Sequence, residues 1–345
     1  MSENHVLLPS LPSTSTEPFH IAFGVDAHYF RGMAVNIASI IVNNPGRAFV
    51  FHVFSFTVSD ADRSRLAVLA EQYGVAIHVT AVDPDIFSEF TKFPRFGHYT
   101  QAIFTRLIIP KAMEGITTRV LYVDADILCM GKIDELAQID IDGYVLAAVP
   151  DDKETTGKIQ SAALQLVHKA YFNSGVLYIN VDRWIAEDIT RKVMQTAVQT
   201  ELPLSFPDQD ALNIVLDGQI AFLEDKWNFR YNMIHDCMAG QPQLRNVDAA
   251  VFLHFTSRVK PWHDWSLHDA RALFLRYQVL SPWADMPLDP PLNYKEMRFF
   301  GLFLFKQKYY ARSLLWNLNY VVAKVKVKIA LMLSGNAGSS YRKSK

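Results

Sequence analysis

Two copies of the tripeptide Asp-Ala-Asp are candidate metal-binding carboxylate pairs, one at residues 60–62 and one at residues 124–126. Paired carboxylates can bind Mg²⁺ or Mn²⁺, and the phosphates of a nucleotide often supply further ligands to such an ion. The bare pattern is not selective, because Asp-x-Asp also begins at Asp83, Asp140 and Asp208. The elements around each pair therefore have to separate a chemical site from a chance match.

The first pair has a structural explanation. Ser59 precedes a helical pattern over residues 59–74 and is a residue type that caps helix N-termini. Asp60 and Asp62 then fall in the first turn, where acids interact favourably with the positive end of the helix dipole. We interpret this pair as part of a helix N-terminus that has no chemical role.

The second pair follows a predicted buried strand. The segment TRVLYVDADIL places Asp124 and Asp126 at the carboxyl end of an apolar run. In open α/β sheets, ligands bind at the carboxyl ends of the strands. Carboxylates beside an apolar strand are costly unless a cation compensates their charge. A solvated turn after an edge strand is the alternative interpretation of the same residues.

Strand and helix patterns alternate along the chain, which predicts an α/β fold with a mostly parallel sheet and helices on both faces. The expected strands are residues 20–26, 48–56 and 75–82, the run before Asp124, residues 144–151, five residues after Gly175, and the run around His254. The expected helices are the run that ends before Pro45, residues 59–74, residues 98–113, and one that begins near residue 206.

The composition indicates one large domain, or one domain with an appendage. Half of the 345 residues are hydrophobic, which excludes bulk disorder. The two cysteines, Cys129 and Cys237, form no Cys-x-x-Cys pair, so we expect no thiolate zinc site. The same cysteine usage fits a protein of the reducing cytoplasm. No signal peptide and no transmembrane helix are predicted. The chain also lacks the glycine-rich fingerprint of nicotinamide enzymes and the Walker phosphate loop.

Charge is concentrated at the C-terminal end. Residues 295–345 contain eleven Lys and Arg and a single acid, Glu296, so the first 294 residues hold 23 Lys and Arg against 34 acids. The basic residues alternate with aromatic and aliphatic ones, a pattern that suits the anionic surface of a membrane. RNA binding and a helical subdomain with a solvated basic face are the alternatives. The period-two run VAKVKVKIA leaves helix and strand both open for its end.

Six segments occur in the order found in glycosyltransferase family 8, which the chain resembles from about His20 to about Trp265. They are IAFGVDAHY, the Arg of FTRLIIP, LYVDADIL, YFNSGVLYIN, FPDQDALN and HFTSRVKPWH. This family comprises retaining, metal-dependent sugar transferases with the Rossmann-like GT-A fold, and the chain is most similar to its lipopolysaccharide core glucosyl- and galactosyltransferases. We expect a loose leader at residues 1–18, a GT-A catalytic domain at 19–285 and a basic, membrane-associating helical extension at 286–345.

The resemblance implies a metal site and a donor site. Asp124, Asp126 and His254 match the ligands of a divalent cation, either Mg²⁺ or Mn²⁺. Asp26 matches a residue that reaches the uracil, and Lys260 one that binds phosphate. The full set of matched donor-binding residues is Gly24, Asp26, Tyr29, Arg106, Asp124, Ala125, Asn173, Ser174, Ser257 and Lys260. Two positions depart from the pattern, because His28 replaces an Asn of some relatives and Ser257 replaces a glycine.

The implied reaction moves glucose from UDP-glucose to a sugar hydroxyl of the lipopolysaccharide outer core, forming an alpha linkage. Gln209, Asp208 and Asp151 match the residues around the anomeric carbon and donor sugar. Gln209 is a poor nucleophile, so we favour a front-face route, in which the departing phosphate accepts the acceptor proton, over a covalent intermediate on Asp151 or Asp208. UDP-galactose as donor, a self-glucosylating enzyme and a non-catalytic sugar-nucleotide-binding protein are the alternatives. We expect a peripheral enzyme on the cytoplasmic face of the bacterial inner membrane, with no nucleic-acid partner.

Overall fold

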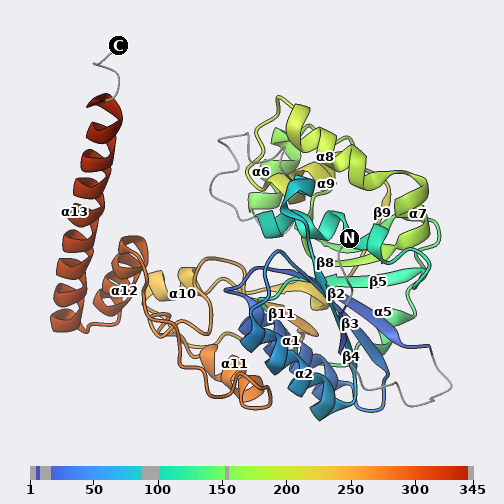
Figure 1. Ribbon diagram of the computed structural model, residues 1–345, viewed down its shortest axis with the longest axis horizontal. Coiled ribbons are helices and arrows are strands. Elements are labelled where there is room, and N and C mark those ends of the chain that lie inside the picture. Colours follow the sequence, from blue (N-terminus) through green and yellow to red (C-terminus); the bar gives the residue numbers. More distant parts are fainter. Residues whose placement is uncertain (1–4, 8–16, 88–100, 152–154, 341–345) are drawn as a thin grey trace. The chain divides into compact units, whose positions relative to one another are not determined.

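The computed structural model describes residues 5–7, 17–87, 101–151 and 155–340 (Figure 1). The chain divides into two compact units. The first comprises residues 1–230, 246–254 and 277–285, and the second comprises residues 231–245, 255–276 and 286–345. The expected α/β fold is confirmed in the first unit, which contains all the strands of both described sheets.

The main sheet has eight strands in the order β1-β4-β3-β2-β5-β8-β7-β9. Strands β4, β3, β2 and β5 run parallel, as do β7 and β9, whereas β8 is antiparallel to both of its neighbours and β1 is antiparallel to β4. The strands are β1 (His5–Leu7), β2 (Phe19–Val25), β3 (Phe49–Ser55), β4 (Ala76–Ala81), β5 (Arg119–Val123), β7 (Leu146–Pro150), β8 (Phe172–Asn180) and β9 (Ile220–Phe222).

Helices cover both faces of this sheet. In Figure 1, α1 and α2 lie against the opposite side of the strands from α8 and α9. A single apolar cluster joins Tyr122 of β5 and Leu177 of β8 to Trp184, Val193 and Leu212 of the helices α7 to α9. The helices and turns of the first unit are α1 (Phe30–Asn43), α2 (Asp60–Tyr73), η1 (Pro84–Phe87), η3 (Gln101–Leu107), α4 (Ile109–Ala112), α5 (Asp134–Ala137), α6 (Thr155–Ala163), α7 (Val181–Ala186), α8 (Ile189–Gln199), α9 (Pro207–Val215) and η4 (Asp225–Asn228).

The first Asp-Ala-Asp pair occupies the predicted helix N-terminus. The backbone N–H of Asp62 donates to Ser59 Oγ at 3.0 Å, so Ser59 caps α2 as expected. Asp60 and Asp62 lie in the first turn, and Gly74 ends the helix with a positive φ of 62°. The capping interpretation of this pair is confirmed.

A second, three-stranded sheet has the order β10-β11-β6. It comprises β10 (Phe229–Arg230), β11 (Phe252–His254) and β6 (Ile127–Cys129). Strand β11 pairs antiparallel with β6, and His254 lies opposite Ile127. Because Ile127 directly follows Asp126, this register brings a histidine from late in the chain beside the second Asp-Ala-Asp pair.

Three expectations about local structure differ from the observed elements. Residues 98–113 do not form one helix: the part from residue 101 onwards consists of the 3₁₀ helix η3 and the short helix α4, and residues 98–100 lie outside the described ranges. Strand β8 spans nine residues and includes Asn173, Ser174 and Gly175, which were expected to precede it. Within the expected leader, His5–Leu7 forms β1.

The second unit ends in two helices, so the C-terminal run is helical rather than extended. Helix α12 (Tyr294–Lys306) is capped by Asn293, whose side chain accepts hydrogen bonds from two backbone N–H groups, and α13 spans Tyr310–Ser340. Phe300 of α12 packs on Trp316 of α13 with ring centroids 4.8 Å apart. This unit also contains α10 (Met233–Ala239), and α11 (Arg271–Gln278) begins in it. Within the described residues, no helix is both long and apolar enough to span a bilayer.

Candidate active site

Asp124, Asp126 and His254 converge on one point at the carboxyl end of β5, where the main sheet meets the second sheet. Their ligand atoms all lie within 4.8 Å of one another. His254 Nε2 is 3.3 Å from Asp126 Oδ1 and 3.9 Å from Asp124 Oδ2. Asp124 directly follows β5, Asp126 directly precedes β6, and His254 ends β11. Asp124, Asp126 and His254 are separated by up to 130 positions in the sequence, and strand pairing brings them together.

The ring of His254 is held in one orientation. Its Nδ1 lies 2.9 Å from Asn228 Oδ1, and a carbonyl oxygen can only accept a hydrogen bond. Nδ1 is therefore the donor, and in the neutral ring the lone pair is on Nε2, the atom that faces the two carboxylates. Lone pairs directed at one another repel unless a cation lies between them. The arrangement fits a divalent metal ion bound by two carboxylates and one imidazole.

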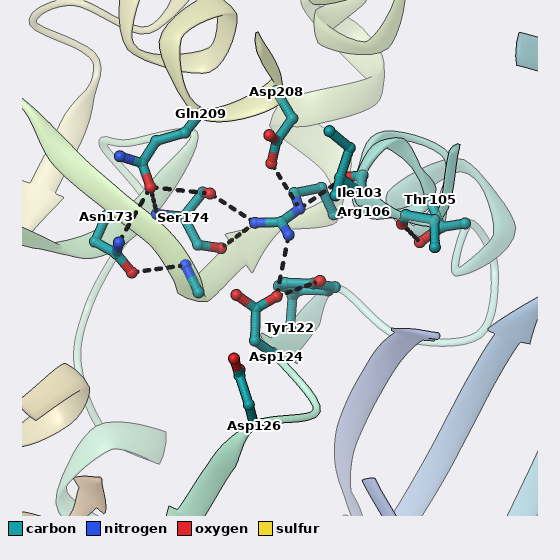
Figure 2. Close-up of polar contacts among 12 residues, drawn as sticks. Ile103, Thr105, Arg106, Tyr122, Asp124, Asp126, Asn173, Ser174, Asp208 and Gln209 are labelled. Carbon is teal, nitrogen blue, oxygen red and sulfur yellow. Dashed lines mark hydrogen bonds and ion pairs between the residues drawn. The ribbon is translucent and has the colours of Figure 1, made fainter. Parts of the chain in front are cut away.

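Arg106 connects Asp124 of the candidate metal-binding cluster to Ser174 of β8 and Asp208 of α9 (Figure 2). Its Nη2 donates to Asp124 Oδ1 at 3.0 Å, and its Nη1 donates to the carbonyl oxygen and hydroxyl of Ser174 at 2.7 and 2.6 Å. Its Nε is 3.3 Å from Asp208 Oδ2. The guanidinium also lies over the ring of Tyr122, which donates a hydrogen bond to Asp124. One buried cation thus fixes the carboxylates of Asp124 and Asp208.

These contacts shift the protonation equilibria in the site. Burial alone would lower the pKa of Arg106, but Asp124, Tyr122 and Asp208 raise it and the net shift is upward. Burial raises the pKa of Tyr122 well above its ordinary value, so this hydroxyl stays protonated and donates to Asp124. Burial also raises the pKa of Asp208, although the ion pair with Arg106 opposes that shift.

Gln209 is held at both ends of its side-chain amide. Oε1 accepts hydrogen bonds from the Ser174 backbone N–H at 3.0 Å and from Asn173 Nδ2 at 3.1 Å, and Nε2 donates to the Tyr171 hydroxyl at 2.8 Å. Tyr171 in turn donates to Asp210. Asp208 and Gln209 both lie in the first turn of α9, and both are buried. Asp210 therefore anchors the Gln209 network and also accepts from the backbone N–H of Phe206.

Asp151 and Gly24 lie at the carboxyl ends of β7 and β2, two strands that β5 and β8 separate. Asp151 follows β7, is buried, and forms an ion pair with Arg230 of β10. Gly24 lies near the end of β2, where a Cβ atom would come within 1.7 Å of the Thr105 hydroxyl oxygen. The Gly24 position therefore tolerates only glycine while η3 packs against it, and η3 is the element that carries Arg106.

Asp26 and Tyr29 lie between β2 and α1. The Asp26 carboxylate accepts the backbone N–H of His28 at 3.0 Å, and its carbonyl oxygen accepts the N–H of Tyr29 at 3.0 Å. Both side chains are partly exposed. Ala125 is buried between Asp124 and Asp126, and the buried Asn36 of α1 donates to the Asp124 carbonyl oxygen at 3.2 Å. This turn is therefore held from both the sheet and α1.

Ser257 and Lys260 belong to the second unit. Ser257 adopts a φ of 130°, a backbone conformation that favours glycine. Lys260 is 4% exposed, and its Nζ donates to the carbonyl oxygen of Phe255 at 2.8 Å.

The structure connects eight of the predicted site residues in one network of contacts. They are Asp124, Asp126, His254, Arg106, Ser174, Asn173, Asp208 and Gln209.

Sequence reasoning missed several residues that support this network. Gly175 is required for packing, because a Cβ atom there would meet His254 Cε1 at 2.4 Å and Asp124 Oδ2 at 2.9 Å. Asn228 accepts a hydrogen bond from His254. Tyr122 donates to Asp124, and the Tyr171 hydroxyl accepts from Gln209. Gly175 follows Asn173 and Ser174 in the quoted motif, so its proximity to the site could have been noticed. Asn228 lies in no pattern that separates it from any other asparagine.

The chain is similar to known proteins along most of its length. The model of glycosyl transferase family 8 matches residues 20–266, and the model of the family 8 C-terminal region matches residues 270–324. The boundary expected at residues 285 and 286 falls inside the second match. The lipopolysaccharide 1,3-galactosyltransferase of Salmonella typhimurium is 32% identical over 322 residues, which are 92% of this chain and 93% of that protein.

A second relative and a solved structure are also similar to this chain. The lipopolysaccharide glucosyltransferase WaaO of Escherichia coli is 28% identical over 312 residues, covering 89% of this chain and 91% of that protein. The crystal structure of the galactosyltransferase LgtC with donor and acceptor sugar analogues superposes with a TM-score of 0.63 at 22% identity, over 76% of this chain and 96% of that one. That similarity supports the GT-A fold. The chain belongs to glycosyl transferase family 8 and is an enzyme that transfers sugar.

Proposed function

We propose that this enzyme transfers glucose from UDP-glucose to a sugar hydroxyl of the lipopolysaccharide core, with retention at the anomeric carbon. The observation that carries this proposal is the convergence of Asp124, Asp126 and His254 beside the buried Arg106. The relatives support the acceptor class, because one is a lipopolysaccharide glucosyltransferase and another a lipopolysaccharide galactosyltransferase.

UDP-galactose is the second candidate donor. The relative that is 32% identical over nearly the whole chain is a 1,3-galactosyltransferase, which favours galactose. The two donors differ only in the configuration of one hydroxyl group. We assign Asp208, Asn173 and Ser174 to the donor sugar. Their side chains can form hydrogen bonds with the hydroxyl groups of either epimer.

The metal-binding residues in this proposal are Asp124, Asp126 and His254. A Mg²⁺ or Mn²⁺ ion bound there would act as a Lewis acid toward the diphosphate leaving group. Lys260 is assigned to phosphate only by its match to the family, and Arg106 positions Asp124. Gly24, Asp26 and Tyr29 bind the nucleoside, with Tyr29 stacking on the base. Ala125 and Ser257 contribute backbone contacts to the donor.

Gln209 determines which route of retention we prefer. A neutral amide is a poor nucleophile, and Oε1 already accepts hydrogen bonds from Asn173 and from the Ser174 backbone. The oxygen is therefore less available for covalent attack than a free carboxylate would be. We infer a front-face reaction, in which the acceptor hydroxyl attacks from the side of the departing phosphate and that phosphate takes its proton. Gln209 then presents a fixed dipole to the oxocarbenium-like sugar.

Asp208 and Asp151 have supporting roles in this route. Both are buried and both are paired with an arginine, Asp208 with Arg106 and Asp151 with Arg230. A carboxylate whose charge is partly neutralised by a neighbouring guanidinium is a weaker nucleophile, but its remaining lone pairs can still accept hydrogen bonds from sugar hydroxyl groups. We therefore assign both residues to the donor sugar and not to a covalent intermediate.

Helix α13 supports peripheral binding to an anionic membrane surface. Trp316 of α13 packs on α12. The face of α13 opposite to Trp316 carries exposed apolar side chains. Those side chains follow a spacing of three or four residues, which places them on one stripe of the helix. They are Leu314, Leu318, Val321, Val325, Ile329 and Met332. Lys324 and Lys328 border one side of this stripe and Lys326 the other, as in helices that lie in a membrane interface.

A UDP-release assay tests the reaction. The full chain is incubated with UDP-glucose or UDP-galactose, with Mn²⁺ or Mg²⁺, and with a panel of truncated lipopolysaccharides. We expect turnover with one donor on one truncation, and an alpha linkage in the product by NMR. Asp126→Asn should abolish turnover. Asp60→Asn, in the other Asp-Ala-Asp pair, is the matched control and should leave turnover unchanged. Tight UDP binding without turnover in any combination would favour the non-catalytic alternative.

A further inference from the structure

A chain of amide side chains connects His254 to Gln209. His254 Nδ1 lies 2.9 Å from Asn228 Oδ1, Asn228 Nδ2 donates to Asn173 Oδ1 at 2.7 Å, and Asn173 Nδ2 donates to Gln209 Oε1 at 3.1 Å. Asn228 is 1% exposed, so it has no direct access to a substrate. The metal-binding cluster and the residue assigned to the anomeric carbon therefore share one hydrogen-bonded support.

The direction of every hydrogen bond in this chain is determined by backbone groups. The N–H of Gly175 donates to Asn173 at 3.0 Å, which identifies the accepting atom as Oδ1 because a backbone N–H can only donate. Asn228 must then direct its NH₂ group at Asn173 and its oxygen at His254. The Ser174 N–H likewise identifies the oxygen of Gln209 as the atom that faces β8. A reversed amide at any position would place two donors or two acceptors in contact.

We propose that Asn228 is a positioning residue for the metal site and for the donor site together. By accepting the Nδ1 proton of His254, it fixes the tautomer whose Nε2 faces Asp124 and Asp126. By donating to Asn173, it directs the other end of that amide at Gln209. This inference rests on the proposed function, because it takes Asp124, Asp126 and His254 to be metal ligands.

The tautomer of His254 can be measured without metal or substrate. Nitrogen-15 NMR of the metal-free protein separates a protonated ring nitrogen from an unprotonated one, and His254→Gln identifies the signal. We expect neutral His254 to carry its proton on Nδ1. A proton on Nε2, or a mixture of both tautomers, would overturn the proposal, whatever the metal does.

Two substitutions of Asn228 should act in opposite directions on metal binding. Asn228→Ala removes the acceptor of the Nδ1 proton, and Mn²⁺ affinity measured by calorimetry should fall about 10- to 100-fold. Asn228→Asp keeps an acceptor and adds negative charge, so Mn²⁺ should bind at least as tightly as in the unchanged protein. Turnover of Asn228→Asp should still fall, because a carboxylate cannot donate to Asn173. A purely structural role would weaken metal binding in both variants.

Asn44 provides a matched control. It is 5% exposed, and its side chain bonds the backbone of Ile40 and of Ile133 with no contact to the metal-binding cluster. Asn44→Ala should leave Mn²⁺ affinity unchanged. Equal loss in Asn44→Ala and Asn228→Ala, or unchanged affinity in Asn228→Ala, would refute the positioning role. If the unchanged protein binds no Mn²⁺, the proposed metal site fails, and the NMR result alone decides whether Asn228 sets the His254 tautomer.

Discussion

Arg106 Nη2 donates to Asp124 Oδ1 at 3.0 Å, and Tyr122 donates to the same oxygen at 2.6 Å. Both donors use one oxygen of the carboxylate, so Oδ2, which lies 3.9 Å from His254 Nε2, accepts neither of these hydrogen bonds. The two lone-pair regions of Oδ1 are filled by these donors. In the metal site that we propose, Oδ2 is therefore the oxygen of Asp124 that would bind the cation.

We expect Arg106→Lys to reduce kcat/KM about 100-fold while the protein remains folded. A lysine keeps the charge but cannot bond Asp124, Ser174 and Asp208 simultaneously, because it lacks the planar guanidinium. UDP affinity by calorimetry and kcat/KM by UDP release measure the effect. A kcat/KM within twofold of the unchanged enzyme would contradict the positioning role that we assign to the guanidinium.

Gly175→Ala should weaken metal binding strongly. The added methyl group would come within 2.4 Å of the His254 ring and 2.9 Å of the Asp124 carboxylate, so one of these ligands must move. We expect a loss of Mn²⁺ affinity on the order of 100-fold, measured by calorimetry. Gly143→Ala is the control, because nothing lies within 4 Å of a Cβ atom at that exposed position. Unchanged Mn²⁺ affinity in Gly175→Ala would show that the cluster does not bind the ion.

Stability should fall as the solution becomes acidic, because of a stack of three histidines on β2, β3 and β4. His52 lies between His20 and His78, with ring centroids 5.2 and 5.3 Å away. Burial, and then the two neighbouring histidines, lower the pKa of His52 to about 3. The unfolded state takes up the proton near pH 6.5, whereas the folded state does so only near pH 3. Protonation of His52 therefore has no effect on the free energy of unfolding well above pH 6.5, and it lowers that free energy as the pH falls from 6.5 toward 3.

The His52 contribution between pH 8 and pH 5 is about 2 kcal/mol. Urea unfolding at several pH values measures it. His52→Phe keeps an aromatic ring in the stack and removes the titrating group, so its stability should depend less on pH. Identical pH dependence in both proteins would show that His52 is not the responsible group.

Ser257→Gly should stabilise the protein by about 1–3 kcal/mol. Ser257 has a φ of 130°, which costs a residue with a Cβ atom on that order and costs glycine little. The Ser257 hydroxyl makes only one long hydrogen bond that is described, to the Val259 carbonyl oxygen at 3.4 Å. Urea unfolding of both proteins gives the difference directly. A lower stability of the glycine variant would mean that the Ser257 hydroxyl contributes more than the backbone strain costs.

Replacing Lys324, Lys326 and Lys328 together by Glu should release the protein from anionic vesicles. Each lysine near an anionic surface contributes about 1 kcal/mol, so removing three should weaken binding on the order of 100-fold. Sedimentation with vesicles of phosphatidylglycerol measures binding, and neutral phosphatidylcholine vesicles provide the comparison. Vesicle binding that is equally strong for the variant would argue against an electrostatic role of α13.

Local chemistry was sufficient to predict some elements. The Ser59 cap and the acids after it are determined by residues within one helical turn, so α2 was identified closely. The prediction of one helix over residues 98–113 is wrong. Thr105 and Arg106 bond carbonyl oxygens three residues back, and Pro110 lacks an N–H, so this run forms a 3₁₀ helix and a short α-helix. Apolar spacing does not report such side-chain bonds to the backbone.

The site itself depends on pairings that no local pattern contains. The candidate metal ligands follow from resemblance to a family, and the structure brings Asp124, Asp126 and His254 together through β6 and β11. Asn228 and Gly175 could not be assigned in this way. Their importance follows from the distance to the His254 ring, which depends on the register of strands far apart in the sequence.

The pairing of β6 with β11 also has a consequence for synthesis of the protein. β6 ends at Cys129 and β11 begins at Phe252, so the ribosome makes 122 residues between the two partners. Asp124 and Asp126 leave the ribosome long before His254, and until then the partner strand that completes their cluster does not exist. The growing chain therefore cannot assemble the three-ligand cluster. The enzyme acquires that cluster only after translation has passed the end of β11.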